Sequence, residues 1–177
     1  MSHRTQREAS DDFLHRLRLA LSCITRQGIV TNRFLDPAGV CVAAFRDDAV
    51  LQRPDAPYPG REHFLLRIAF NYRIVRAGRR EWDVEVSQYF YVLLDGTGNE
   101  LLAYHWHPVS ESRVKTPHLH LGRGADVGCA ELQPKVHLPT GFVALGEFLL
   151  FLIREMKVLP LRGDWERVLE STRAAGA

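Results

Sequence analysis

Two long stretches of alternating apolar residues constrain the fold of this chain more than any other feature. Between Phe64 and Val75, and again between Trp82 and Asp95, apolar side chains recur at most alternate positions. A strand turns successive side chains to opposite faces of a sheet, so this period predicts two strands that each carry one apolar face. The segment from Arg76 to Arg80 contains Gly78 and supplies a turn between them. We therefore expect a long antiparallel hairpin.

A second turn, Asp95 to Asn99, leads into a third expected strand from Glu100 to His107. The register that best matches the apolar residues of the two strands places Leu94 opposite Glu100. On the other face of the sheet, this register gives two further pairs, Tyr89 with His105 and Ser87 with His107.

Apolar residues at helical spacing predict one helix from Asp11 to Gln27 and another from Thr140 to Lys157, with Thr140 as its N-cap. Asp164 is placed to cap a third, short helix. The whole chain, residues 1–177, is therefore expected to form a single α+β domain. In this domain helices cover the apolar face of an antiparallel sheet of four to five strands. The two ends, 1–10 and 172–177, are expected to be flexible.

The composition narrows the class of protein. The net charge of +2 is too small to indicate a general binder of nucleic acids or membranes. The three cysteines are far apart, and the first dozen residues contain no apolar signal-peptide core. These features predict a cytoplasmic protein that does not associate with membranes.

Four of the eight histidines lie in two His-x-His pairs, His105 with His107 and His118 with His120. On strands, the members of each pair point to the same face. If the segment 117–121 folds back on the third strand, His107 could lie opposite His118, and His105 opposite His120. His137 is a candidate for a fifth imidazole in the same group. The sequence thus predicts a histidine cluster on one face of the sheet.

The predicted registers place polar side chains on the same face as the histidines. Those that we expect to contact a substrate are Arg67, Arg73, Asn71, Tyr89 and Ser87.

One interpretation of the cluster is cleavage of a phosphodiester in RNA without a metal. Two of His105, His107, His118 and His120 would then act as general acid and general base. Arg67 and Arg73 would neutralise the phosphate. In this interpretation the protein is a ribonuclease-like phosphodiesterase that needs no cofactor.

Two other interpretations stay open. Imidazoles at this spacing also suit Zn or another transition metal, in an enzyme or a sensor. The potential ligands are His105, His107, His118, His120 and His137. In the third interpretation the histidines are structural and the protein is a non-catalytic interaction module.

The order of the motifs also resembles a known family. The segment Tyr104-His-Trp is followed by Pro117-His-Leu-His120 and then by a C-terminal helix. Over roughly residues 85–157, this arrangement resembles the small TumE-like toxin proteins of bacterial toxin–antitoxin pairs. The resemblance implies a cytoplasmic toxin-like protein, with an RNA or nucleotide substrate and a cognate antitoxin-like partner. Only His118 and His120 are carried over by the motif itself.

Overall fold

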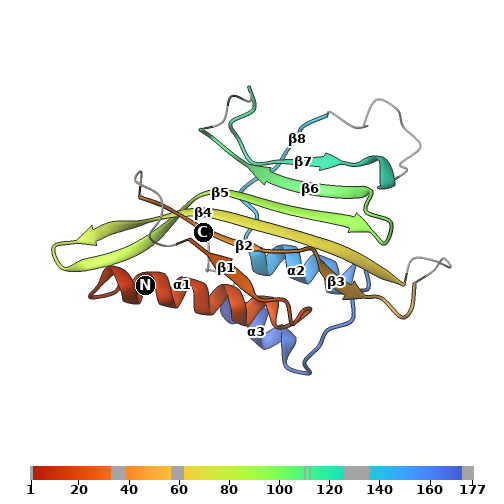
Figure 1. The fold of residues 1–177 in the computed structure, drawn as a ribbon, viewed down its shortest axis with the longest axis horizontal. Coiled ribbons are helices and arrows are strands. Elements are labelled where there is room, and N and C mark those ends of the chain that lie inside the picture. The colour runs from red at the N-terminus through yellow and green to blue at the C-terminus, as the bar shows by residue number, and fades with distance from the viewer. Residues whose placement is uncertain are drawn as a thin grey trace.

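The computed structural model describes residues 2–32, 39–56, 62–109, 111, 113–125 and 136–172. These residues form one α+β domain, in which three α-helices pack against an antiparallel sheet of eight strands (Figure 1). The predicted fold class is confirmed, but the predicted number of strands is wrong. Four of the strands have only two to four residues each, too few for an alternating pattern to reveal them.

The sheet is built around the predicted hairpin. Its strands lie in the order β1-β2-β4-β5-β6-β7-β8, and β3 also pairs with β4. In chain order they are β1 (Ile29–Thr31), β2 (Val40–Phe45), β3 (Ala49–Gln52), β4 (His63–Gly78), β5 (Glu81–Asp95), β6 (Glu100–Trp106), β7 (His118–Leu121) and β8 (Leu138–Pro139).

The helices differ from the prediction in their bounds. Helix α1 (Gln6–Leu21) begins five residues before the predicted start, because Thr5 and Glu8 form a capping box around its first turn. This first turn of the helix lies within residues 1–10, which the sequence predicts to be a flexible end. The last five residues, 173–177, lie outside the described part of the chain.

Helix α2 (Leu145–Arg154) begins later than predicted, and α3 (Trp165–Thr172) follows it. The N-cap of α2 is Ala144, which makes no side-chain capping bond. The backbone N–H of Thr140 instead donates to the carbonyl of Pro117, so this residue belongs to the edge of the sheet. The predicted N-cap role of Thr140 is therefore wrong.

Helices α1 and α2 cover one face of the sheet, and α3 packs against both of them (Figure 1). The ring of Phe13 on α1 lies 4.8 Å from that of Tyr72, and Phe148 on α2 stacks at 5.1 Å on Tyr91. Burying a phenylalanine side chain fully contributes roughly 1.5–3 kcal/mol, so this aromatic layer holds helices and sheet together. The opposite face of the sheet carries the histidines.

The predicted register of β5 with β6 is wrong by one residue. An irregularity between Leu93 and Leu94 shifts the pairing, so that Phe90 lies opposite His105 and Tyr89 lies opposite Trp106. Leu94 still pairs with Glu100. A bulge of this kind adds one residue to one strand and thereby exchanges the faces beyond it. Consequently Tyr89 does not lie opposite His105 as predicted. Ser87 lies at a second irregularity, where β5 pairs with β4 between Asn71 and Tyr72.

In the described part of the chain, no helix combines the length and the apolar character needed to cross a membrane.

Candidate metal centre

The histidine cluster lies on β6 and β7, towards one side of the sheet. His105 pairs with His118 across the two strands, and His120 lies beside Ala103. The predicted pairing of these strands is therefore wrong by two residues. A shift of two residues leaves the faces unchanged. The prediction that His105, His118 and His120 gather on the face opposite the helices is thus confirmed.

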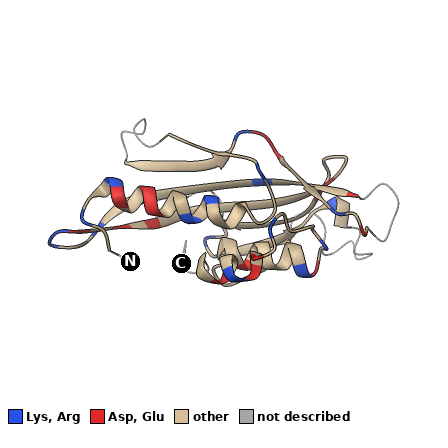
Figure 2. Cartoon of the chain, turned by 90° about the horizontal axis from the view of Figure 1, so that it is seen from below, with Lys and Arg blue, Asp and Glu red and all other residues tan. Residues whose placement is uncertain are grey.

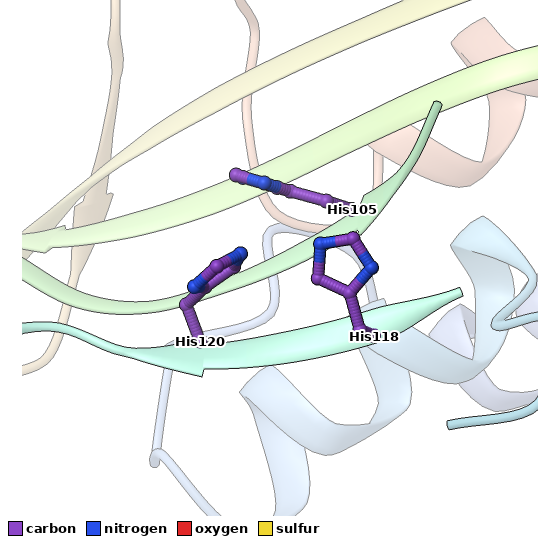
Figure 3. A group of neighbouring side chains, drawn as sticks. All are labelled: His105, His118 and His120. Atoms are coloured by element: carbon purple, nitrogen blue, oxygen red, sulfur yellow. The ribbon is translucent and has the colours of Figure 1, made fainter. Parts of the chain in front are cut away.

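Three imidazoles surround a common space (Figure 3). The ring centroids of His105 and His118 each lie 4.9 Å from that of His120, and they are 5.8 Å from each other. One potential ligand nitrogen from each ring lies within 4.8 Å of the other two. No other group of three histidine, cysteine or acidic side chains comes this close within the described ranges.

His118 is fully buried, and its ring is oriented by the backbone. Its Nδ1 lies 2.8 Å from the carbonyl oxygen of Thr116. A carbonyl can only accept, so Nδ1 carries the proton and donates. The lone pair of the neutral ring is therefore on Nε2, the nitrogen on the opposite side. Such a hydrogen bond from the distal nitrogen is typical of histidines that ligate metals.

Two ring nitrogens of the cluster are buried without a hydrogen-bond partner among the described residues. They are the Nε2 atoms of His105 and His118. Leaving a buried polar atom unsatisfied costs about 1–3 kcal/mol, and native structures contain few such atoms. Both nitrogens are therefore available to a ligand that enters the space between the rings.

The imidazoles of His105, His118 and His120 are neutral at pH 7. Burial, with the neighbouring His120 and His118, lowers the pKa of His105 to about 4. Burial and the neighbouring His137 and His118 lower the pKa of His120 to about 4. Burial also lowers the pKa of His118, although its hydrogen bond to Thr116 opposes this effect. The three rings are therefore unprotonated at neutral pH, as metal ligands must be.

The two remaining histidines flank this group. His137, which is exposed, has its ring centroid 4.4 Å from that of His120 and 4.8 Å from that of His118. His107 lies 5.2 Å from His118, but its ring stacks on Phe90 with an angle of 12° between the planes. His137 is thus the nearer candidate for a fourth ligand.

The predicted phosphate contacts do not converge on this cluster. The guanidinium of Arg67 makes a bidentate ion pair with Asp48, in which Nε donates to Oδ1 and Nη2 donates to Oδ2, each at 2.8 Å. Its fork is therefore occupied by a carboxylate. Arg73 is exposed and lies opposite Glu85. The β4 residue in line with His105 is Ala69, which pairs with the same Phe90, and Arg73 follows it four residues further along the strand.

The other predicted substrate contacts also have structural partners. Asn71 donates its side-chain amide to Gln88, and the Ser87 hydroxyl donates to the backbone carbonyl of Asn71. Tyr89 is fully buried on the helix side, where its ring stacks at 4.7 Å on Tyr91. The expectation that Tyr89 faces the histidines is wrong, because Tyr89 pairs with Phe70 and Trp106 and not with His105.

Sequence reasoning missed two residues that shape the site. Thr116 orients His118 through a backbone carbonyl, for which no sequence signal exists. Phe90 lies 5.1 Å from the ring of His105 and 5.9 Å from that of His107, and so forms an apolar wall. Its position opposite His105 would have followed from the sequence if the bulge had been foreseen.

Comparisons with protein-family models, with curated proteins and with solved structures give no match for this chain. The resemblance to TumE-like toxins therefore stays a prediction, and the site must be interpreted from its own geometry.

Proposed function

We propose that this protein binds one transition-metal ion through His105, His118 and His120, and that the ion keeps one coordination position for water or substrate. The observation that carries the proposal is the convergence of two buried, unpartnered Nε2 atoms with the ring of His120. A metal ion would satisfy both nitrogens at once.

The donor set favours zinc. Three neutral imidazoles with a fourth, open position are typical of catalytic zinc sites, whereas structural zinc sites use four protein ligands and usually cysteines. Cobalt, nickel and copper also bind imidazole, so selectivity depends on supply and geometry. A zinc ion acts as a Lewis acid and lowers the pKa of bound water, which is the chemistry of hydrolysis and hydration.

The spacing of the rings indicates how binding would change the site. The ligand nitrogens are up to 4.8 Å apart, whereas tetrahedral zinc with bonds of about 2.0–2.1 Å requires separations of roughly 3.3 Å. The three rings would therefore draw together on binding. His137 is exposed beside His120 and His118, and in the proposed site it stays outside the ligand set, so that the fourth position remains open.

Metal-independent cleavage of RNA has less support. A general acid at pH 7 must be protonated, but the pKa values of His105 and His120 are about 4. Arg67, the predicted phosphate contact nearest the cluster in the sheet, is held by Asp48. The toxin-like activity and the antitoxin-like partner depend on the same interpretation and stay predictions.

The proposal is tested by titrating the metal-free protein with Zn²⁺ in a calorimeter and by elemental analysis after purification. We expect one ion per chain. In His118→Asn the amide nitrogen can still donate to the Thr116 carbonyl, but no atom replaces Nε2. We expect this variant to fold and to lose the tight site. Unchanged zinc binding by His118→Asn would contradict the assignment.

His15→Ala is the matched control, because His15 is exposed on α1 and distant from the cluster in the fold. It should bind zinc as the wild type does. A parallel assay with RNA and chelator distinguishes the alternative. Cleavage by metal-free wild type, lost in His118→Asn, would favour the acid–base mechanism instead.

A further inference from the structure

A second site lies at the opposite end of the hairpin from the histidines. A surface pocket of about 560 Å³ is lined by Arg4, Arg76, Arg79, Arg80, Glu81 and Trp82. Figure 2 shows the basic residues gathered where β4 turns into β5, close to the start of α1. At about 3.3 Å per residue along β5 from Phe90 to Glu81, the pocket is about 30 Å from the histidine cluster.

The fold brings a distant part of the chain into this pocket. His3 and Trp82 exchange two backbone hydrogen bonds of 2.8 Å, which form a short antiparallel bridge. The next residue is Arg4, whose backbone N–H donates to the carboxylate of Glu8 at the start of α1. Arg4 is thus tied on both sides and lies beside the turn of the hairpin. The pocket does not depend on one loop alone.

The pocket carries a concentrated positive charge. Four guanidinium groups and one carboxylate line it, which gives a formal charge of +3, whereas the whole chain carries +2. Nearby carboxylates have other partners. Glu8 caps α1, and Asp12 binds Arg16 at 2.8 Å. Four like charges in one pocket repel one another, and a bound anion would relieve this repulsion.

The types of side chain suit the phosphate groups of a nucleotide. Guanidinium groups bind phosphate oxygens with two parallel hydrogen bonds, and every cation of the pocket is an arginine. Arg76 lies over the ring of Trp82, with 5.0 Å between its Cζ and the ring centroid. This contact fixes one guanidinium and places a half-buried indole in the wall. Indole rings also stack on the bases of nucleotides.

We infer that this pocket binds the phosphate groups of a nucleotide, either free or as part of a single-stranded nucleic acid. Its volume is within the range of sites for single small ligands. The phosphates would contact Arg79, Arg80 and Arg4, and the base would contact Trp82. This site is separate from the proposed metal centre and does not require it.

The inference is tested by calorimetric titration of the full chain with three probes, namely inorganic triphosphate, ATP and an eight-residue uridine oligonucleotide. The double variant Arg79→Gln/Arg80→Gln changes two exposed side chains and leaves β4 and β5 intact. We expect it to weaken binding by about tenfold or more, because hydrogen bonds to charged groups contribute roughly 1.5–3 kcal/mol each. Raising the salt from low to physiological concentration should weaken wild-type binding as well.

The matched control is Arg18→Gln/Arg26→Gln, which removes the same charge from a second pocket of about 340 Å³. It should bind like the wild type. Binding of triphosphate and ATP would identify a free nucleotide as the ligand, and binding of the oligonucleotide alone would identify a nucleic acid. Equal losses in both double variants, or no binding of any probe, would overturn the inference.

Discussion

At the scale of single residues, the protonation of the histidines decides what the cluster can do. The rings of His105 and His120 are neutral down to a pH of about 4, although an exposed histidine titrates near 6.5. A neutral imidazole is a ligand or a base, whereas a protonated one is an acid. The low pKa values therefore suit His105 and His120 to act as ligands or as a general base, and not as the general acid at pH 7.

These pKa values predict how stability depends on pH. In the unfolded chain His105 and His120 take up protons near 6.5, but in the fold they do so only near 4. Between these values the unfolded state binds more protons. The metal-free protein should therefore lose stability as the pH falls from about 6.5 to about 4. Thermal unfolding at a series of pH values measures this slope.

The variant His105→Gln/His120→Gln should show a flatter dependence in the same window. The most perturbed carboxyl groups do not obscure it. Burial opposes the ionisation of Asp95, but the combined hydrogen bonds from Thr97 and Asn99 outweigh it and lower the pKa of Asp95 to about 2. Hydrogen bonds from Arg162 and Arg167 lower the pKa of Asp164 to about 2. Their contributions are lost only below about pH 4. An identical slope in variant and wild type would refute the explanation.

The sequence predicted which histidines share a face, because the two-residue spacing within each pair sets this on any strand. It could not predict that Nε2 of His118 is the free nitrogen. This property depends on the carbonyl of Thr116, and every residue type has a carbonyl in the same place.

At the scale of elements, one bulge explains most of the errors in the predicted site. The turn after β5 is anchored by Asp95, which accepts hydrogen bonds from the backbone N–H groups of Thr97 and Asn99. The pairing of Leu94 with Glu100 next to this turn is as predicted. At the irregularity between Leu93 and Leu94, β6 contains one extra residue, Leu101, so that Tyr89 lies opposite Trp106 and not opposite His105. Alternating apolar residues do not reveal it, because β5 carries apolar side chains on both faces near its end.

The close contact between the end of β7 and β6 predicts a sensitive glycine. Gly122 donates its backbone N–H to the carbonyl of Leu101 at 2.9 Å. A Cβ at this position would overlap the backbone carbonyl of Glu100, which cannot move without disturbing β6. Gly122→Ala should therefore destabilise the protein by about 1–3 kcal/mol. Urea unfolding followed by circular dichroism measures the change.

Gly28→Ala is the control for this substitution, because a Cβ at Gly28 would have no atom within 4 Å. It should leave the midpoint of unfolding nearly unchanged. Equal stabilities of Gly122→Ala and the wild type would show that β7 does not pack against β6 as described. Since β7 carries His118 and His120, we also expect Gly122→Ala to weaken zinc binding.

At the scale of the whole molecule, the sequence predicted one domain with helices on one face of an antiparallel sheet. The apolar faces of the two long strands must be buried against another element, and the amphipathic helices predicted from the sequence supply the apolar surface for this. The outer strands escaped prediction because they are short. Strands β7 and β8 have four and two residues, and their place is set by neighbours rather than by their own pattern.

A ligand that binds only the folded state stabilises the whole domain. At a free zinc concentration 100 times the dissociation constant, the gain is about 2.7 kcal/mol. For a chain of this length, this gain should raise the melting temperature by about 5–10 °C. Differential scanning fluorimetry with and without zinc measures the shift. His118→Asn should show none, and a shift in this variant equal to that of the wild type would place the ion elsewhere.

The proposed ligands come from two strands, so an ion held by them would be a cross-link as well as a reagent. His105 belongs to β6, and His118 and His120 belong to β7. Chelation would then do more than stop chemistry. It would destabilise the pairing of β7 with β6 near the edge of the sheet. The amide protons of β7 would then exchange with solvent sooner than those of β4 and β5. When the metal is scarce, the first effect on this protein would thus be local opening of the edge strands around β7.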